Sequence, residues 1–160
     1  MRPVSAALIA FALIPLSLGV AACKPRKATD SSRRVYCEVM PDAPRRDNDD
    51  KPTKIIGMVR FRCDDPGATT MALAMQVQRR DAKGDWINVG STSFTVAAAQ
   101  TVSTREETFR THQVTTGCAD GAFRVFIKGS SSASGVTKTY ERAGPRTFNP
   151  CRPGLFAPKH

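Results

Sequence analysis

The chain has 160 residues, of which 24 are basic and 14 acidic, giving a formal net charge of +10. A mass of 17.3 kDa allows one compact domain with a short appendage, which excludes a multi-domain enzyme or a multi-span membrane protein. Two histidines exclude a histidine-rich metal site, and the cysteine count of five is odd.

The first 22 residues have the layout of a signal peptide. A short basic start (MRP) precedes the uncharged stretch from Val4 to Ala22, which ends in the small residues VAA directly before Cys23. An aliphatic residue, two small residues and a cysteine resemble a bacterial lipobox, in which the thiol accepts a lipid and the preceding peptide is removed. We therefore expect residues 1–22 to be a signal peptide and Cys23 to be the lipidation site.

Two other interpretations of this segment stay open. The same small residues suit ordinary signal peptidase, whose cleavage would release the protein outside the cell. An uncleaved anchor would be a helix of about 28 Å. Pro15 and Gly19 weaken the anchor interpretation, because both disfavour an unbroken helix.

Residues 23–34 read as a basic flexible tether. The stretch KPRKATDSSRR at 24–34 has five basic residues, one acidic residue and no apolar periodicity. Beside a membrane, each basic residue could add about 1 kcal/mol of attraction to anionic lipid. The alternative is a solvated spacer whose charge keeps the domain away from the membrane.

Without Cys23 an even set of four cysteines remains, and in an oxidising compartment it predicts two disulfides. The set is Cys37, Cys63, Cys118 and Cys151. Four cysteines allow three pairings, and the spacing leaves all three open.

Alternation of large apolar with small or polar residues dominates the chain from residue 35 onward. Met71, Leu73, Met75 and Val77 alternate with alanine and glutamine, which predicts a half-buried strand although the residue types favour a helix. The predicted strands cover residues 35–40, 59–63, 71–78, 86–89, 93–96, 104–114, 123–127 and 136–140. Without a long amphipathic helix, these short strands predict an all-β fold, an Ig-like antiparallel β-sandwich of about seven strands over residues 35–151 with a tail at 152–160.

Turn residues separate the strands. Asp81 to Asp85 and Asp64 to Gly67 both resemble hairpin loops. The stretch from Pro41 to Pro52 (PDAPRRDNDDKP) has three prolines and no large apolar residue, so we expect it outside the core. The stretch from Gly129 to Gly135 (GSSSASG) is typical of a flexible link between the last two strands. Loops often carry binding sites, so these two are the first places to look for one.

A recurring order of residues carries a family resemblance. It consists of Tyr36-Cys37, Cys63, Trp86, the stretch CADGAF at 118–123 and a final Cys151. The order resembles the small exported two-disulfide Ig-like β-sandwich proteins of actinobacteria, most of them of unknown function. The resemblance implies the sandwich and the consecutive pairing of Cys37 with Cys63 and of Cys118 with Cys151. It implies no catalytic residues.

Catalytic chemistry finds little support in the residue types. A serine hydrolase needs a base, and the only histidines are His112, in a polar predicted strand, and the C-terminal His160. Adjacent Glu106 and Glu107 would point to opposite faces of a strand. Asp64 and Asp65 are more simply turn formers. We therefore expect no enzyme.

Metal and cofactor sites are not expected either. A calcium loop that starts at Asp47 and includes Asp49 and Asp50 has Pro52 and Met58 where glycine and glutamate are needed. A looser calcium site stays open. The chain also lacks the cysteine or histidine spacing of a zinc site and the motif of a phosphate-binding loop.

The remaining signal is positive charge on strands. From Cys37 onward there are 18 basic and 13 acidic residues, a net charge of +5. Six of the basic residues alternate with apolar positions and would form one basic face if their strands share a sheet: Arg60, Arg62, Arg79, Arg80, Arg124 and Lys128. Such a face could contact nucleic acid, teichoic acid or phospholipid. Outward arginines also serve simply to prevent aggregation of sheets.

Together these patterns predict an exported lipoprotein at the cell surface, anchored in the membrane through Cys23, with a non-catalytic binding or structural domain. Its expected partners are the membrane and an envelope polyanion or protein. The alternative function is a secreted inhibitor that presents a disulfide-braced loop to an extracellular enzyme such as a protease.

Overall fold

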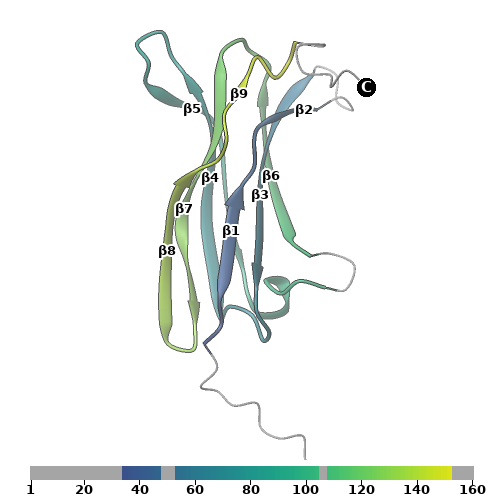
Figure 1. The fold of residues 1–160 in the computed structure, drawn as a ribbon, viewed down its shortest axis with the longest axis vertical. Coiled ribbons are helices and arrows are strands. Elements are labelled where there is room, and N and C mark those ends of the chain that lie inside the picture. The colour runs from purple at the N-terminus through teal and green to yellow at the C-terminus, as the bar shows by residue number, and fades with distance from the viewer. Residues whose placement is uncertain (1–33, 48–52, 105–107, 153–160) are drawn as a thin grey trace, which may run out of the picture.

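The computed structural model describes residues 34–47, 53–104 and 108–152, which form two antiparallel sheets packed face to face (Figure 1). The predicted β-sandwich is therefore confirmed. Seven of the nine described strands have five residues or more, and two short strands add to them. The strands are β1 (Cys37–Pro41), β2 (Arg45–Asp47), β3 (Lys54–Cys63), β4 (Thr70–Arg80), β5 (Trp86–Val96), β6 (Arg110–Gly117), β7 (Ala122–Ala133), β8 (Val136–Ala143) and β9 (Thr147–Phe148), with one 3-10 turn, η1 (Ala98–Gln100).

The first sheet is built around β3. Val59 on β3 pairs with Pro41 of β1 on one side and with His112 of β6 on the other. Farther along β3, Ile56 pairs with Arg45 of β2 and also with β6. Strands β1 and β2 therefore follow one another along the same side of β3.

The second sheet has the order β5-β4-β7-β8, and β9 also pairs with β7. Phe123 on β7 pairs with Arg79 of β4 on one side and with Thr147 of β9 on the other. Strands β8 and β9 therefore follow one another along β7, as β1 and β2 follow one another along β3.

The core lies between the two sheets and follows the predicted alternation. Met71, Leu73, Met75 and Val77 of β4 are each at most 2% exposed, whereas their neighbours on the other face of the strand are exposed or half-buried. Burying a side chain of this size contributes roughly 1.5–3 kcal/mol. Burial of one face therefore outweighs the helix propensity of these residues.

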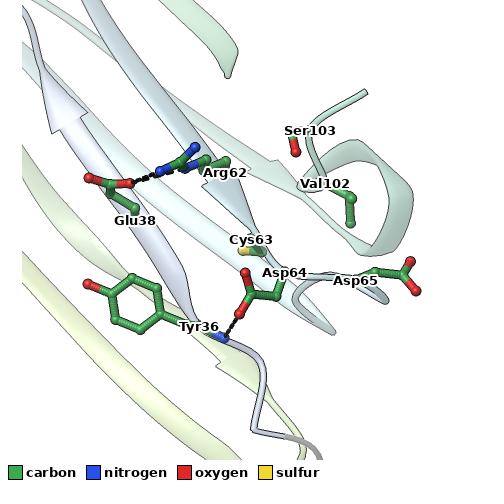
Figure 2. A pocket seen from close by; sticks show the side chains of 8 residues that line it. All are labelled: Tyr36, Glu38, Arg62, Cys63, Asp64, Asp65, Val102 and Ser103. Carbon is green, nitrogen blue, oxygen red and sulfur yellow. Dashed lines mark hydrogen bonds and ion pairs between the residues drawn. The ribbon is translucent and has the colours of Figure 1, made fainter. Parts of the chain in front are cut away.

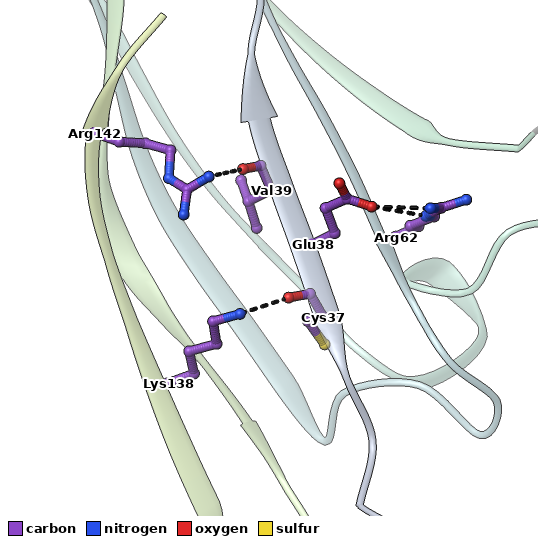
Figure 3. A network of polar contacts seen from close by, with 6 residues as sticks. All are labelled: Cys37, Glu38, Val39, Arg62, Lys138 and Arg142. Atoms are coloured by element: carbon purple, nitrogen blue, oxygen red, sulfur yellow. Dashed lines mark hydrogen bonds and ion pairs between the residues drawn. The ribbon is translucent and has the colours of Figure 1, made fainter.

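Side chains of β8 cover the outer edge of β1 (Figure 3). Lys138 Nζ donates to the carbonyl oxygen of Cys37 at 3.1 Å, and Arg142 donates to that of Val39 at 3.3 Å. The buried Tyr140 hydroxyl also donates to the Cys37 carbonyl, at 3.4 Å. Edge strands expose unpaired carbonyl groups that invite pairing with other chains, so these bonds close one side of the sandwich.

The opposite side is closed by β5 and β6. Thr116 on β6 donates its hydroxyl to the Val89 carbonyl oxygen at 2.6 Å. The His112 ring stacks on Phe94 of β5, with ring centroids 4.0 Å apart, and Phe94 contacts Phe61 at 5.5 Å. The two sheets are therefore joined along both edges.

Strand β5 corrects one expectation. The sequence predicted two strands, at 86–89 and 93–96, whereas a single strand runs from Trp86 to Val96. It continues because Gly90 fits tightly against β6, where a Cβ atom would come within 3.0 Å of Thr116 Cβ. A polar edge strand can also keep Ser91 and Ser93 in solvent.

The predicted flexible link at Gly129–Gly135 is also wrong. Strand β7 continues through Ala133, which leaves only Ser134 and Gly135 as the turn to β8. Ser131 is 4% exposed, and its hydroxyl lies 2.8 Å from that of Tyr140. Small polar residues here form part of the sheet because their hydroxyl groups find partners inside it.

Three loop expectations are corrected as well. Pro44 is fully buried although the segment from Pro41 to Pro52 was expected to stay outside the core, and Arg45–Asp47 form β2. The turn at Asp64–Gly67 connects β3 of the first sheet to β4 of the second, so it is no hairpin. Strand β6 begins at Arg110 rather than Thr104.

Candidate functional site

The structure contains both predicted disulfides with the consecutive pairing. Cys37 and Cys63 are register partners on β1 and β3, and both are buried. Cys118 and Cys151 are joined with a Cα–Cα distance of 5.9 Å. This second bridge fixes the end of the described chain to the segment that connects β6 with β7.

Several sequence predictions lie outside the described residues. They concern the signal peptide, Cys23 and the tether up to residue 33, together with Asp49, Asp50, Glu106, Glu107 and His160. Among the described residues, no group of histidine, cysteine, aspartate or glutamate side chains is placed to hold a metal ion. No helix in the described part of the chain is long and apolar enough to cross a bilayer.

The six predicted basic side chains do not share one sheet. Arg60 and Arg62 lie on β3 in the first sheet. Arg79 and Arg80 on β4, and Arg124 and Lys128 on β7, lie in the second. The prediction of a single basic face required all six side chains to lie on one sheet. Because the strands that carry them belong to two sheets, this prediction is wrong.

Three of the six side chains already have carboxylate partners. Arg60 binds Asp42 at 2.7 Å, and Arg62 binds Glu38 at 3.0 Å. Both guanidinium groups also lie over the Phe109 ring, 5.5 and 4.4 Å from its centroid. In the second sheet, Lys128 pairs with Glu141 at 3.7 Å. These pairs neutralise the charge that a polyanion would need.

The remaining arginines gather at the end of the second sheet near the β4–β5 turn. Arg80 donates its Nε to the Gly84 carbonyl oxygen of that turn at 3.0 Å. Arg124 donates its Nε to Gln78 Oε1 at 2.9 Å. Neither bond neutralises the guanidinium charge.

Trp86, Arg124 and Arg146 form what we call the arginine–tryptophan cluster. The Cζ atoms of Arg124 and Arg146 lie 4.2 and 5.5 Å from the centroid of the Trp86 ring. Burial, and then the charge of Arg146, lower the pKa of the Arg124 guanidinium. Sequence reasoning found Arg124 but missed Arg146, because Arg146 precedes the two-residue strand β9 and belongs to no alternating pattern.

The opposite end of the sandwich has an open cleft of about 510 Å³ (Figure 2). Its lining residues are Tyr36, Glu38, Arg62, Cys63, Asp64, Asp65, Val102 and Ser103. Asp64 Oδ2 accepts a hydrogen bond from the Tyr36 backbone N–H at 3.4 Å. Three carboxylates and one guanidinium make the cleft acidic in a basic protein.

A more apolar depression of about 360 Å³ lies beside this cleft, between the start of β1 and the β7–β8 turn. Tyr36 and Val136 border it and are 62% and 60% exposed. Lys138 Nζ lies 4.4 Å from the centroid of the Tyr36 ring. Arg34, the first described residue, also lines the depression.

His112 lines none of these sites. Its ring packs on Phe94 at the seam between the sheets, and burial lowers its pKa below the usual value of 6.5. The cleft therefore gathers Asp64 and Asp65 without the histidine that sequence analysis considered as a base.

The half-buried position of His112 predicts a dependence of stability on pH. The unfolded chain takes up a proton near pH 6.5 and the folded chain only at lower pH, so the free energy of unfolding should fall as pH decreases from 7 to 5. Urea denaturation of the wild type and of His112→Gln at several pH values measures this fall. The variant should show a shallower fall, and equal slopes would contradict the assignment.

No protein-family model matches this chain, and no curated protein matches it either.

Proposed function

We propose that the protein is an exported lipoprotein whose β-sandwich is a non-catalytic binding domain at the cell surface. One observation carries the proposal: β1 begins at one end of the sandwich, and the β4–β5 turn, beside which the arginine–tryptophan cluster lies, is at the other (Figure 1). A lipid on Cys23 would therefore hold the first end near the membrane and direct the cluster outward.

The dimensions of the domain suit this orientation. Strand β7 has 12 residues and runs from the cluster end to the β7–β8 turn, a distance of about 40 Å. The tether from Lys24 to Arg34 could extend over at most about 40 Å. The end of the domain where β1 begins would thus stay within about 40 Å of the membrane, which leaves the cluster end free to face away from it.

The side chains at the first end suit a position near lipid headgroups. Tyr36 and Val136 are exposed there, beside the cations Arg34 and Lys138. Tyrosine is favoured at membrane interfaces, and cations are attracted to anionic lipid. Two disulfides are compatible with the oxidising compartment that export would provide.

The binding role is favoured over catalysis by the contents of the cleft. Glu38 is paired with Arg62, Asp64 bonds the Tyr36 backbone, and His112 lies elsewhere. Nucleophilic catalysis needs a nucleophile and a base within hydrogen-bond reach of each other. The inhibitor alternative needs a protruding ordered loop, and the turn at Ser134 and Gly135 is only two residues long.

Replacing Cys23 with serine tests the anchor. We expect the wild type to incorporate a labelled fatty acid and Cys23→Ser to incorporate none, because serine cannot form the thioether to the lipid. Lys24→Gln, which leaves the cysteine intact, is the matched control and should be labelled like the wild type. Growth with the labelled fatty acid, followed by purification of each variant, measures the incorporation.

The proposal is contradicted if the wild type and Cys23→Ser incorporate equal amounts of label. Absence of label in both, with the protein in the membrane fraction, would indicate an uncleaved anchor. Absence of label in both, with the protein in the medium, would indicate ordinary cleavage of the signal peptide.

A further inference from the structure

The arginine–tryptophan cluster places two like charges side by side, one on β7 and one in the segment that leads into β9. Thr147 of β9 pairs with Phe123 of β7, and Gly144 N donates to the Val125 carbonyl oxygen at 2.8 Å. Between these two contacts, the register places Arg146 beside Arg124. Like charges directly opposite each other on adjacent strands destabilise a sheet.

The Arg124 guanidinium is held in place, and both guanidinium groups lie over the same ring despite this repulsion. Arg124 is fixed by its bond to Gln78 and by its contact with the Trp86 ring. Arg146 contacts the same ring, and within residues 34–47, 53–104 and 108–152 it has no carboxylate partner. The described salt bridges of the second sheet and its flanks, Lys128–Glu141 and Arg152–Asp120, lie elsewhere.

An anion between the two arginines would relieve the repulsion. The Nε of Arg124 is occupied by Gln78, which leaves its two terminal nitrogens as donors. Guanidinium groups bind oxyanions through pairs of parallel N–H bonds, and such charge-assisted bonds are about twice as strong as neutral ones. The terminal N–H groups of Arg124 and the N–H groups of Arg146 are therefore donors without an acceptor among the described residues.

We propose that Arg124 and Arg146, supported by Trp86, bind a phosphoryl group. A carboxylate can be satisfied by one guanidinium, whereas a phosphoryl group has enough oxygens to accept from two arginines on different segments of the chain. Both cations lie over the Trp86 ring, so the ring supports the arginines. The site recognises phosphate itself and not a base sequence.

The identity of the natural ligand rests on the proposed function, because the outward orientation of the cluster depends on the anchor at Cys23. In that orientation the phosphoryl group belongs to a soluble or surface molecule and not to the lipid of the anchoring membrane. Phosphate binding by the purified protein does not depend on the anchor, so the two proposals fail separately.

Trp86 is the single tryptophan of the chain and reports directly on this site. We would titrate the purified full-length protein with inorganic phosphate and, separately, with short-chain polyphosphate, and follow tryptophan fluorescence. We expect a saturable change that weakens at high salt. Arg124→Gln and Arg146→Gln should each weaken binding about tenfold or more, since each removes charge-assisted bonds.

Lys83→Gln is the matched control, because it removes one positive charge from the neighbouring β4–β5 turn without touching the cluster. It should change the affinity less than about twofold, as expected for an exposed charge. If inorganic phosphate gives a saturable change, a single phosphate ion is sufficient as a ligand. If only polyphosphate gives one, the ligand is a polymer of phosphoryl groups. No saturable change with either probe, or equal losses in Lys83→Gln and Arg146→Gln, overturns the proposal.

Thermal unfolding gives a second readout that separates binding from folding. Phosphate should raise the melting temperature of the wild type, because a ligand that binds only the folded state stabilises it. It should leave Arg146→Gln unchanged, while that variant without ligand melts no lower than the wild type. An Arg146→Gln variant that is destabilised without ligand would instead make Arg146 a structural residue.

Discussion

Replacing both Cys37 and Cys63 with alanine is expected to lower the free energy of unfolding by about 5 kcal/mol, the largest effect we predict. Their sequence separation of 26 residues gives roughly 3.5 kcal/mol from loop closure in the unfolded chain. Both sulfur atoms also belong to the buried core, where they pack among Val39, Phe61 and other side chains. Their removal leaves a cavity that adds to the loss.

The second bridge provides the matched comparison. Cys118 and Cys151 are 33 residues apart, so loop closure alone ranks this bridge slightly above the first. It lies near the surface, however, and Asn149, Asp120 and Arg152 hold the same segment by hydrogen bonds. We therefore expect the Cys118→Ala/Cys151→Ala protein to lose about 3 kcal/mol.

Urea denaturation of the two double variants measures this difference. Burial of the first bridge predicts the lower midpoint for Cys37→Ala/Cys63→Ala. The opposite order would mean that loop length and not core packing determines the contribution of each bridge.

Gly129→Ala is expected to lower the free energy of unfolding by about 2–3 kcal/mol. Gly129 lies on β7 opposite Leu73 of β4, and a Cβ atom there would overlap the Ala72 carbonyl oxygen and come within 2.8 Å of Leu73 Cα. Both contacts are with backbone atoms, so no side-chain rotation relieves them. The two central strands of the second sheet would have to separate.

Gly117→Ala is the control for this prediction. Gly117 ends β6, and no atom lies within 4 Å of the position that its Cβ would occupy. We expect a change within about 0.5 kcal/mol. Chemical denaturation of both variants tests the contrast, and equal losses would show that Gly129 matters only through its intrinsic strand propensity.

The β-sandwich could be predicted because alternation is a local signal. The apolar residues from Met71 to Val77 reveal their buried face within a single strand. The even set of cysteines similarly predicted two bridges. The pairing required the resemblance or the structure, because spacing alone cannot show that Cys37 lies opposite Cys63.

Features that depend on tertiary pairing could not be predicted. The basic residues are divided between two sheets because β3 and β4, although consecutive in the chain, belong to different sheets. No property of Arg60 or Arg79 reveals this division. Burial of Pro44 and the inclusion of Ser131 in β7 likewise depend on neighbours far along the chain.

The candidate site shows the same limit. Arg124 alternates with apolar residues and could be selected from the sequence. Its partner Arg146 comes from the segment between β8 and β9, and Trp86 reaches both from β5. Only the assembled sheet shows that Arg124 and Arg146 lie side by side, with no carboxylate of the described residues paired to either.

The central claim, an exported domain anchored at Cys23, is tested most directly by the intact mass of the mature protein without reduction. We expect a chain that begins at Cys23, with a lipid on that residue and without the hydrogens of the four cysteines in the two disulfides. A mature chain that begins elsewhere, or that carries an unmodified Cys23, would contradict it.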